Sequence, residues 1–146
     1  MRGLAVRLAG LLWLIAAPPA LAAAPIPNWK QQAPGLWTSA DGRCALKQQQ
    51  LTTHMKIFPN RAAAAGFAPA LQRQLFAQHF TGVVVGPIYR FGQWGLLAYY
   101  HYHAAQGDFQ IWQLYLSRKG LAETLTGSAR AGLQDPCVTN LERYLG

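Results

Sequence analysis

Two histidines, His101 and His103, are separated by one residue within an aromatic run near the middle of the chain. On a β-strand, residues i and i+2 point to the same face, so the two imidazoles would lie side by side and could bind one metal ion. A third ligand would have to come through the fold from His54, His79 or Asp108. The alternative interpretation is a polar strand that faces solvent or a partner.

Hydroxyl and carboxylate side chains offer a second chemistry. Ser117 or Ser128 could complete a Ser/His/Asp set with His103 and Asp108, and Asp108 could pair with Glu123 for glycoside hydrolysis. However, the sequence has no G-x-S-x-G turn, no P-loop and no G-x-G-x-x-G, and its five acidic residues are dispersed. We therefore predict a protein that is not an enzyme and that uses no cofactor.

Aromatic residues are concentrated between positions 94 and 115. A sheet that is covered on one face needs about half of them for its core, which leaves the rest for an exposed surface. Tyr, Trp and Arg are the residue types enriched at interaction hot spots. We predict a partner-binding surface made of Tyr100, Tyr102, Trp112 and Arg118; the alternative is that these residues are core or ordinary strand surface.

A sheet is needed to position these residues. Three β-rich runs within 94–130 are joined by glycine-containing turns at 106–108 and 118–120, which predicts an antiparallel meander. Leu125 on the last run alternates with Thr124 and Thr126, a pattern expected when only one face is covered.

Three more β-prone segments precede the meander. Residues 35–47 predict a hairpin around Asp41-Gly42, and residues 51–58 predict a strand. Residues 83–91 predict another strand, in which Gly86-Pro87 implies an edge position, a bulge or a bend.

Two helices are predicted to pack on this sheet. The first starts near Pro69 and runs to Phe80, with Phe67, Leu71 and Leu75 on its apolar face. The second follows an aspartate N-cap and a proline at 135–136 and ends near residue 145. The predicted fold class is α+β, with a twisted antiparallel sheet, a central helix and a C-terminal helix packed on it.

The beginning of the chain predicts export. Arg2 and Arg7 precede an apolar run at 8–17 that is too short to span a bilayer comfortably, and Ala20-Leu21-Ala22 resembles a cleavage site. We predict a signal peptide at 1–22 cleaved near Ala22, a lead-in segment at 23–34 and one domain at 35–146. The mature protein would be periplasmic or secreted and not an integral membrane protein.

The two cysteines, Cys44 and Cys137, predict a disulfide in an oxidising compartment. The bond would tie the start of the domain to its end. A redox-active pair is the alternative, although the sequence has no C-x-x-C motif.

The mature protein is basic. Without the two N-terminal arginines, eleven Lys and Arg residues remain against five Asp and Glu, a net charge of +6. This charge favours anionic surfaces such as phospholipid head groups or acidic partners. The basic residues are scattered along the chain, and we predict no nucleic-acid binding by an exported protein.

The order of elements resembles the PsbP-like or DcrB-like α+β family. The resemblance lies in the stretches 94–98, 115–120 and 125–129 and in the terminal helix. Members act as assembly factors, adaptors and chaperones, which implies a non-catalytic, chaperone-like accessory factor that binds a protein partner in the cell envelope. The alternatives are a metal- or small-ligand-binding protein that uses His101 and His103, and an inhibitor or immunity protein of an exported hydrolase.

Overall fold

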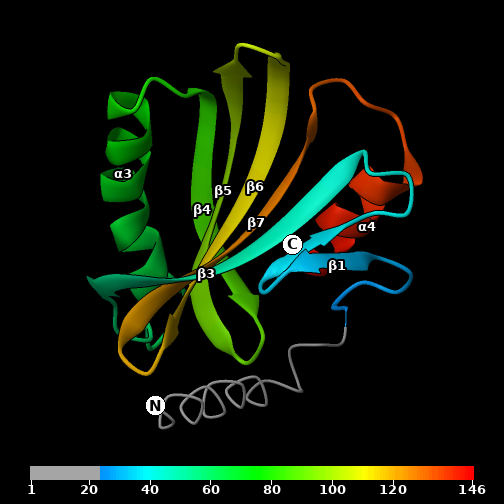
Figure 1. Ribbon diagram of the computed structural model, residues 1–146. Coiled ribbons are helices and arrows are strands. Elements are labelled where there is room, and N and C mark those ends of the chain that lie inside the picture. Colours follow the sequence, from blue (N-terminus) through cyan, green and yellow to red (C-terminus); the bar gives the residue numbers. More distant parts are fainter. Residues whose placement is uncertain (1–23) are drawn as a thin grey trace, which may run out of the picture.

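The computed structural model describes residues 24–146, which form one seven-stranded antiparallel sheet with two helices (Figure 1). Strands take up 51% of the described chain and helices 22%, so the sheet dominates the fold. The predicted α+β domain with a central helix is therefore wrong, because the sheet is central and the helices lie on its faces. The predicted signal peptide lies outside the described residues.

The strands lie in the order β1-β2-β3-β7-β6-β5-β4, and each neighbouring pair is antiparallel. The predicted meander is confirmed and extends back to β4, whose predicted edge position is also confirmed. The hairpin around Asp41-Gly42 is confirmed as the β2–β3 connection. The strand bounds are β1 Lys30–Ala33, β2 Leu36–Thr38, β3 Cys44–His54, β4 Thr81–Arg90, β5 Gln93–Ala104, β6 Gly107–Arg118 and β7 Leu121–Arg130.

Two segments contain more strand than their sequences indicate. Residues 51–54 of the strand predicted at 51–58 are the end of a single long strand, β3, which also takes in the three glutamines at 48–50; the predicted continuation to 58 is wrong, because β3 ends at His54. Residues 23–34 were expected to be a lead-in segment, yet they contain β1 and bury Ile26 and Trp29. These two side chains pack in the larger of two apolar clusters and hold the segment to the domain.

Helix α3 (Arg61–Ala77) connects β3 to β4 at the far edge of the sheet and packs on β4 and β5 (Figure 1). The prediction that it starts near Pro69 is wrong. The Asn60 side chain accepts a hydrogen bond from the backbone N–H of Ala63, and this cap together with four alanines begins the helix eight residues earlier. Its buried face is Ala64, Ala68, Leu71 and Leu75, and Phe67 points outward.

Helix α4 (Pro136–Leu145) packs on β3, β6 and β7. Its predicted start is confirmed, because the Asp135 side chain accepts from the backbone N–H of Cys137 and Pro136 opens the first turn. The predicted disulfide is also confirmed: Cys137 is bonded to Cys44 at the start of β3, across 93 residues of chain. The bond fixes the beginning of α4 to the sheet.

The two helices cover opposite faces of the sheet, and each covers its own apolar cluster. Along β6, Ile111 packs in the cluster under α3, whereas Trp112 and Leu114 pack in the cluster under α4. This alternation follows from the two-residue period of a strand. The prediction that only one face of the last strand is covered is wrong, since Thr124 is buried on the α3 side and Leu125 on the α4 side.

Candidate functional site

The predicted histidine pair lies on β5, on the α4 side of the sheet. His103 pairs across strands with Asp108, and its Nδ1 lies 2.8 Å from Asp108 Oδ1. Its Nε2 lies 3.0 Å from Thr81 Oγ1 on β4. Both ring nitrogens of His103 are therefore engaged, and a metal ion would have to displace one of these partners.

His101 has a different environment on the same face. Its Nε2 lies 3.3 Å from the hydroxyl of Tyr99, and the two rings pack edge to face with centroids 5.5 Å apart. Asp108, one of the three predicted third ligands, contacts His103 and does not form a three-ligand group with the pair among residues 24–146. Metal binding by His101 and His103 stays a prediction.

The hydrogen bonds at His103 link a hydroxyl, an imidazole and a carboxylate in the order used by Ser/His/Asp hydrolases. The hydroxyl belongs to Thr81 and not to Ser117 or Ser128. Ser117 is buried and donates to the backbone carbonyl of Met55. The side chains of His103 and Asp108 are 54% and 60% exposed, so water screens this charge pair and its contribution to stability is small.

The four residues predicted to bind a partner do not form one surface. Tyr100 and Trp112 are 5% and 6% exposed and lie in the clusters on opposite faces. Tyr102 is 45% exposed and packs against Phe80, whereas Arg118 lies at the other end of the sheet. A tyrosine or tryptophan on a strand can be either buried or exposed, and the sequence alone does not show which. For this reason the sequence pattern could not distinguish core positions from surface positions here.

Tyr100 and Tyr115 belong to a polar network on the α3 side of the sheet. Both hydroxyls donate to Oε1 of Gln113, at 3.0 and 2.7 Å, and Nε2 of Gln113 donates to the hydroxyl of Thr126. Burial raises the pKa of Tyr100 to about 12 and also raises the pKa of Tyr115. The network gives the two tyrosine hydroxyls hydrogen-bond partners within the protein. The tyrosine rings are then free to make apolar contacts.

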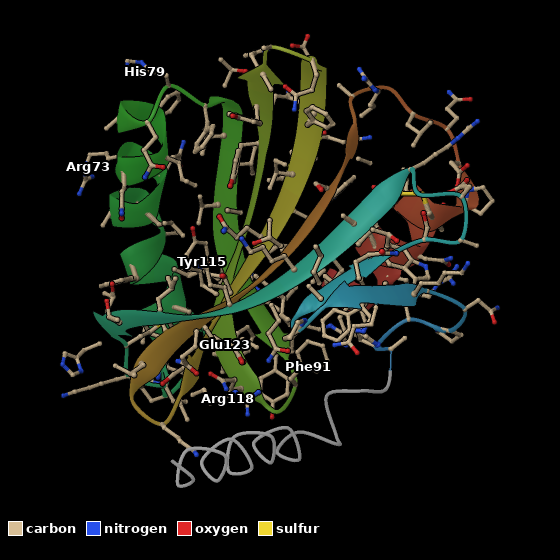
Figure 2. All side chains as sticks on the ribbon, viewed as in Figure 1. Arg73, His79, Phe91, Tyr115, Arg118 and Glu123 are labelled. Carbon is tan, nitrogen blue, oxygen red and sulfur yellow. A yellow bond between two sulfur atoms is a disulfide. The ribbon has the colours of Figure 1, made fainter. Side chains whose placement is uncertain are left out.

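A carboxyl group is buried on the opposite face. Glu123 is 4% exposed, and its Oε2 accepts from Nε of Arg118 at 2.9 Å and from Nε2 of Gln48 at 2.7 Å. It lies beside a small cavity that Phe91 and Tyr144 also line. Figure 2 shows Phe91, Arg118 and Glu123 near the same end of the sheet.

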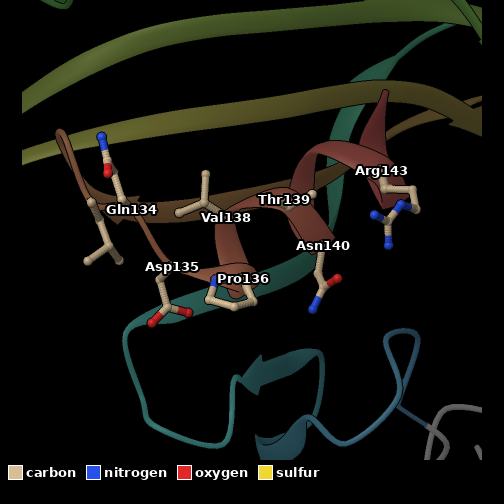
Figure 3. A pocket seen from close by; sticks show the side chains of 8 residues that line it. Gln134, Asp135, Pro136, Val138, Thr139, Asn140 and Arg143 are labelled. Atoms are coloured by element: carbon tan, nitrogen blue, oxygen red, sulfur yellow. The ribbon is translucent and has the colours of Figure 1, made fainter.

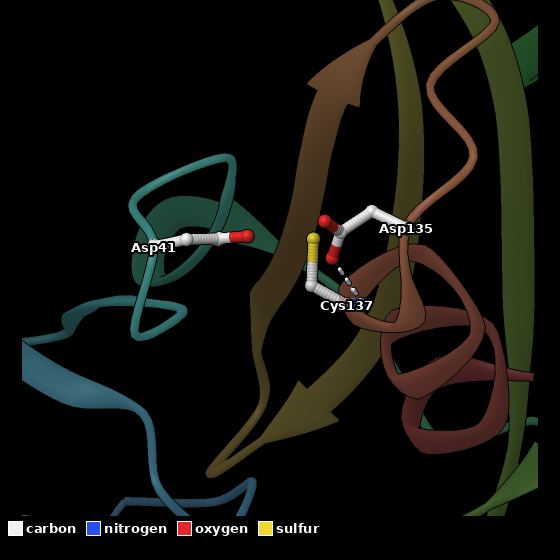
Figure 4. Close-up of side chains that lie close together, drawn as sticks. All are labelled: Asp41, Asp135 and Cys137. Carbon is white, nitrogen blue, oxygen red and sulfur yellow. Dashed lines mark hydrogen bonds between the residues drawn. The ribbon is translucent and has the colours of Figure 1, made fainter.

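One group of metal-type ligands occurs among the described residues, formed by Asp41, Asp135 and Cys137 (Figure 4). The sulfur of Cys137 is held in the disulfide, and Asp135 caps α4. A hydrogen bond from the Arg43 backbone N–H, with another from the Ser39 hydroxyl, holds the pKa of Asp41 below its usual value. These three residues therefore have structural roles: Asp41 in the turn, Asp135 as the cap of α4 and Cys137 in the disulfide.

A largely apolar depression lies between α3 and the end of β3, on the α3 side of the sheet. This α3–β3 groove has a volume of about 260 Å³ and is half open to solvent. Tyr115 and Leu96 come from the sheet beneath it, and Phe67 comes from α3. The lining residues are Leu51, Thr53, His54, Met55, Phe67, Ala70, Leu71, Gln74, Leu96, Tyr115 and Ala122.

A second depression, larger and more open, runs along the outside of α4 (Figure 3). It has a volume of about 570 Å³, and Gln134, Asn140 and Arg143 are among its polar lining residues. Its openness and mixed lining make it a poorer binding site than the α3–β3 groove, because binding sites are concave and mostly apolar.

The α3–β3 groove was missed by the sequence analysis. Its walls come from β3, α3, β5, β6 and β7. Their adjacency depends on the crossover through α3 from β3, inside the sheet, to β4 at its edge. The sequence pattern placed Phe67 on the buried face of α3 with Leu71 and Leu75, but it lies at the edge of that face and is 54% exposed, so the pattern gave no signal for the groove. Comparison with protein-family models and with curated proteins finds no match to this chain.

Proposed function

We propose that this protein is an exported, non-catalytic binding module of the cell envelope, and that it holds an apolar segment of a partner protein in the α3–β3 groove. The observation that carries this proposal is the groove itself, a half-open apolar depression with an exposed phenylalanine at its rim. Concave apolar surfaces of this kind are the usual places where proteins bind ligands and peptide segments.

The rim residue is Phe67, whose side chain is 54% exposed although it lies among apolar neighbours. Its ring packs against Phe58, with ring centroids 5.6 Å apart, and this contact fixes the direction in which the ring points. Covering apolar surface is worth about 25 cal/mol per Å². A bound segment that covers Phe67 would therefore gain affinity without having to order the ring first.

The floor of the groove is apolar because the only phenol there points its hydroxyl elsewhere. Tyr115 donates to Gln113 at 2.7 Å, so its ring and not its oxygen is offered to the groove. The polar groups in the lining are Thr53, His54 and Gln74. Apolar walls with a few polar groups suit an amphipathic protein segment, which needs some hydrogen bonds for orientation.

The disulfide is compatible with export. A bond between Cys44 and Cys137 persists in an oxidising compartment such as the periplasm and is rare in the cytosol. The histidine pair takes no part in this proposal, because His101 and His103 lie on the other face of the sheet. The likeness to the PsbP-like or DcrB-like family stays a prediction, and the accessory role proposed here agrees with it.

Two phenylalanines of α3 provide a matched test. Phe67 and Phe76 are both 54% exposed and lie on the same helix, but only Phe67 lines the groove. Phe67→Ser and Phe76→Ser remove similar exposed apolar area, so they should change solubility alike, and thermal unfolding checks that both variants remain folded. The experiment is capture of proteins from envelope extract by each immobilised variant, with mass spectrometry of what is bound.

We expect wild type and Phe76→Ser to retain the same stoichiometric partner and Phe67→Ser to lose it. Equal capture by all three proteins would reject the groove as the binding site. Loss in both variants would show that capture follows general exposed apolarity and would also count against the proposal.

A further inference from the structure

A second surface, separate from the α3–β3 groove, lies at one end of the sheet. Because the sheet is antiparallel, the β4–β5 turn, the β6–β7 turn and the end of β3 lie together at this end. Helix α3 begins there and α4 ends there. We call this surface the turn end; it comprises residues 55–61, 89–92, 118–120 and 142–146.

Hydrogen bonds join the parts of the turn end into one unit. The Met55 backbone N–H donates to the carbonyl of Gly120, and the Ser117 hydroxyl donates to the carbonyl of Met55. Arg90 donates through its guanidinium to the carbonyls of Arg143 and Tyr144, where α4 ends. The loops at this end are thus held in fixed positions relative to the sheet.

Positive charge is concentrated at the turn end. The one Asp or Glu residue within it is Glu142, which is exposed; Glu123, nearby on β7, is buried and already paired with Arg118. The other three acids of the protein, Asp41, Asp108 and Asp135, belong to the connections and strand starts at the opposite end. The basic residues of the turn end are Lys56, Arg61, Arg90, Arg118, Lys119 and Arg143.

Four of these cations are available to a ligand. Arg90 is occupied by the end of α4, and Arg118 by Glu123. Within residues 24–146, the remaining four make no ion pair and their residues are exposed. They are Lys56, Arg61, Lys119 and Arg143.

Apolar side chains project among these cations. Ile57 is 59% exposed in the segment after β3, and Phe91 is 47% exposed in the β4–β5 turn. Phe91 has a backbone φ of 51°, in the left-handed region, and its ring packs on Tyr144 with centroids 5.4 Å apart. A bulky residue with positive φ is unusual, and here the ring lies between Tyr144 and the Arg90 guanidinium, 4.7 Å from its centroid, with about half of its surface left exposed.

We propose that the turn end docks on the surface of an anionic phospholipid bilayer. Cations would bind phosphate head groups while Ile57 and Phe91 enter the boundary between head groups and acyl chains. A bilayer fits better than an acidic protein because Ile57 and Phe91 are exposed on two different loops, and a broad surface of head groups and acyl chains can contact both together with the cations. The net positive charge of the protein is concentrated on this same surface. It is therefore complementary to the negative charge of anionic phospholipid head groups.

The test is sedimentation of the oxidised protein, without residues 1–22, with vesicles. One set of vesicles contains phosphatidylglycerol and phosphatidylcholine, and the other contains phosphatidylcholine alone. The double variant Lys56→Glu/Lys119→Glu changes the turn end, whereas Lys30→Glu/Arg73→Glu makes the same change in net charge at exposed positions elsewhere. Circular dichroism checks that both variants remain folded.

We expect wild type to bind only the anionic vesicles. Each basic residue near an anionic surface strengthens binding about fivefold, so losing two at the turn end should weaken binding at least about thirtyfold, and the two added carboxylates should weaken it further. The control variant should lose less than about threefold, because its charges are more than a Debye length from the bilayer. Phe91→Ser should weaken binding without changing its dependence on salt.

Three results would overturn the proposal: no binding by wild type, equal binding to both kinds of vesicle, or equal weakening in the two charge variants. This proposal does not rest on the groove. A protein that keeps its partner but fails to bind vesicles would refute only the membrane docking, and the converse result would refute only the groove.

Discussion

Glu123 is the one charged side chain that is almost fully buried among residues 24–146. Its partners Gln48 and Arg118 come from different strands, and Gln48 is 75 positions away in the sequence. Nothing in the sequence distinguishes this glutamate from the exposed Glu142, because its burial depends on the pairing of β3 with β7. Removing a partner would leave a buried charge with incomplete hydrogen bonding.

We expect Arg118→Ala to lower the free energy of unfolding by about 1 kcal/mol, a modest value because more than half of the Arg118 side chain is exposed. In a Glu123→Gln background, the same substitution should cost less than about 0.5 kcal/mol, since no buried charge is left behind. Urea unfolding of the four proteins measures this coupling. Equal costs in both backgrounds would mean that Arg118 acts through packing alone.

Tyr100 makes stability depend on alkaline pH. Burial raises its pKa to about 12 from 10, so the unfolded chain ionises first as pH rises. The stability contributed by the neutral phenol is fully present below pH 10 and is lost between about pH 10 and 12. Tyr100→Phe should flatten this part of the stability curve, measured by urea unfolding between about pH 9 and 12. An unchanged curve in Tyr100→Phe would contradict the assignment.

Strands and turns were the elements best predicted from sequence. The Gly-containing turns of the meander, the Asp41-Gly42 hairpin and the capped start of α4 each have a strong local cause, and the structure confirms them. Helix α3 was predicted poorly because Gly66 and Pro69 weaken the local signal. Packing of its buried face on β4 and β5 outweighs that penalty.

Glycine substitutions test these two helices separately. Gly66 lies within α3 with open space around its Cα, so Gly66→Ala should raise the free energy of unfolding by about 0.5–1 kcal/mol. A Cβ at Gly127 would lie 2.8 Å from a methyl carbon of Leu141 in α4, which is fully buried. Gly127→Ala should therefore cost about 1–3 kcal/mol.

Thermal or urea unfolding measures both changes. A destabilised Gly66→Ala would show that the glycine relieves strain beside Pro69. A neutral Gly127→Ala would show that α4 is packed less tightly on the sheet than described.

The molecule as a whole is held by one sheet, two apolar clusters and one disulfide. The disulfide could be predicted, because two cysteines in a chain that is expected to be exported have few other uses. The candidate binding site could not be predicted from the sequence. The α3–β3 groove forms where five elements come together, and no local sequence pattern indicates which elements will be neighbours. The predicted partner-binding tyrosine and tryptophan turned out to be needed for the two clusters that flank the sheet.

Reduction of the Cys44–Cys137 bond should lower the free energy of unfolding by about 4 kcal/mol, because the bond closes a loop of 93 residues in the unfolded chain. The double variant Cys44→Ser/Cys137→Ser should show the same loss without reductant and no further loss with it. Urea unfolding with and without dithiothreitol measures this. If reduction left stability unchanged, the bond would contribute nothing to holding α4 on the sheet.

The measurement that tests the proposed function most directly is site-specific photocrosslinking in living cells. A photoreactive amino acid replaces Ala70, which lines the groove, or Ala65, which is also exposed on the same helix but is not among the groove's lining residues. We predict one dominant crosslinked partner from position 70 and none from position 65. Crosslinking that is absent at position 70, or equal at both positions, would contradict the proposal that the groove holds a partner protein.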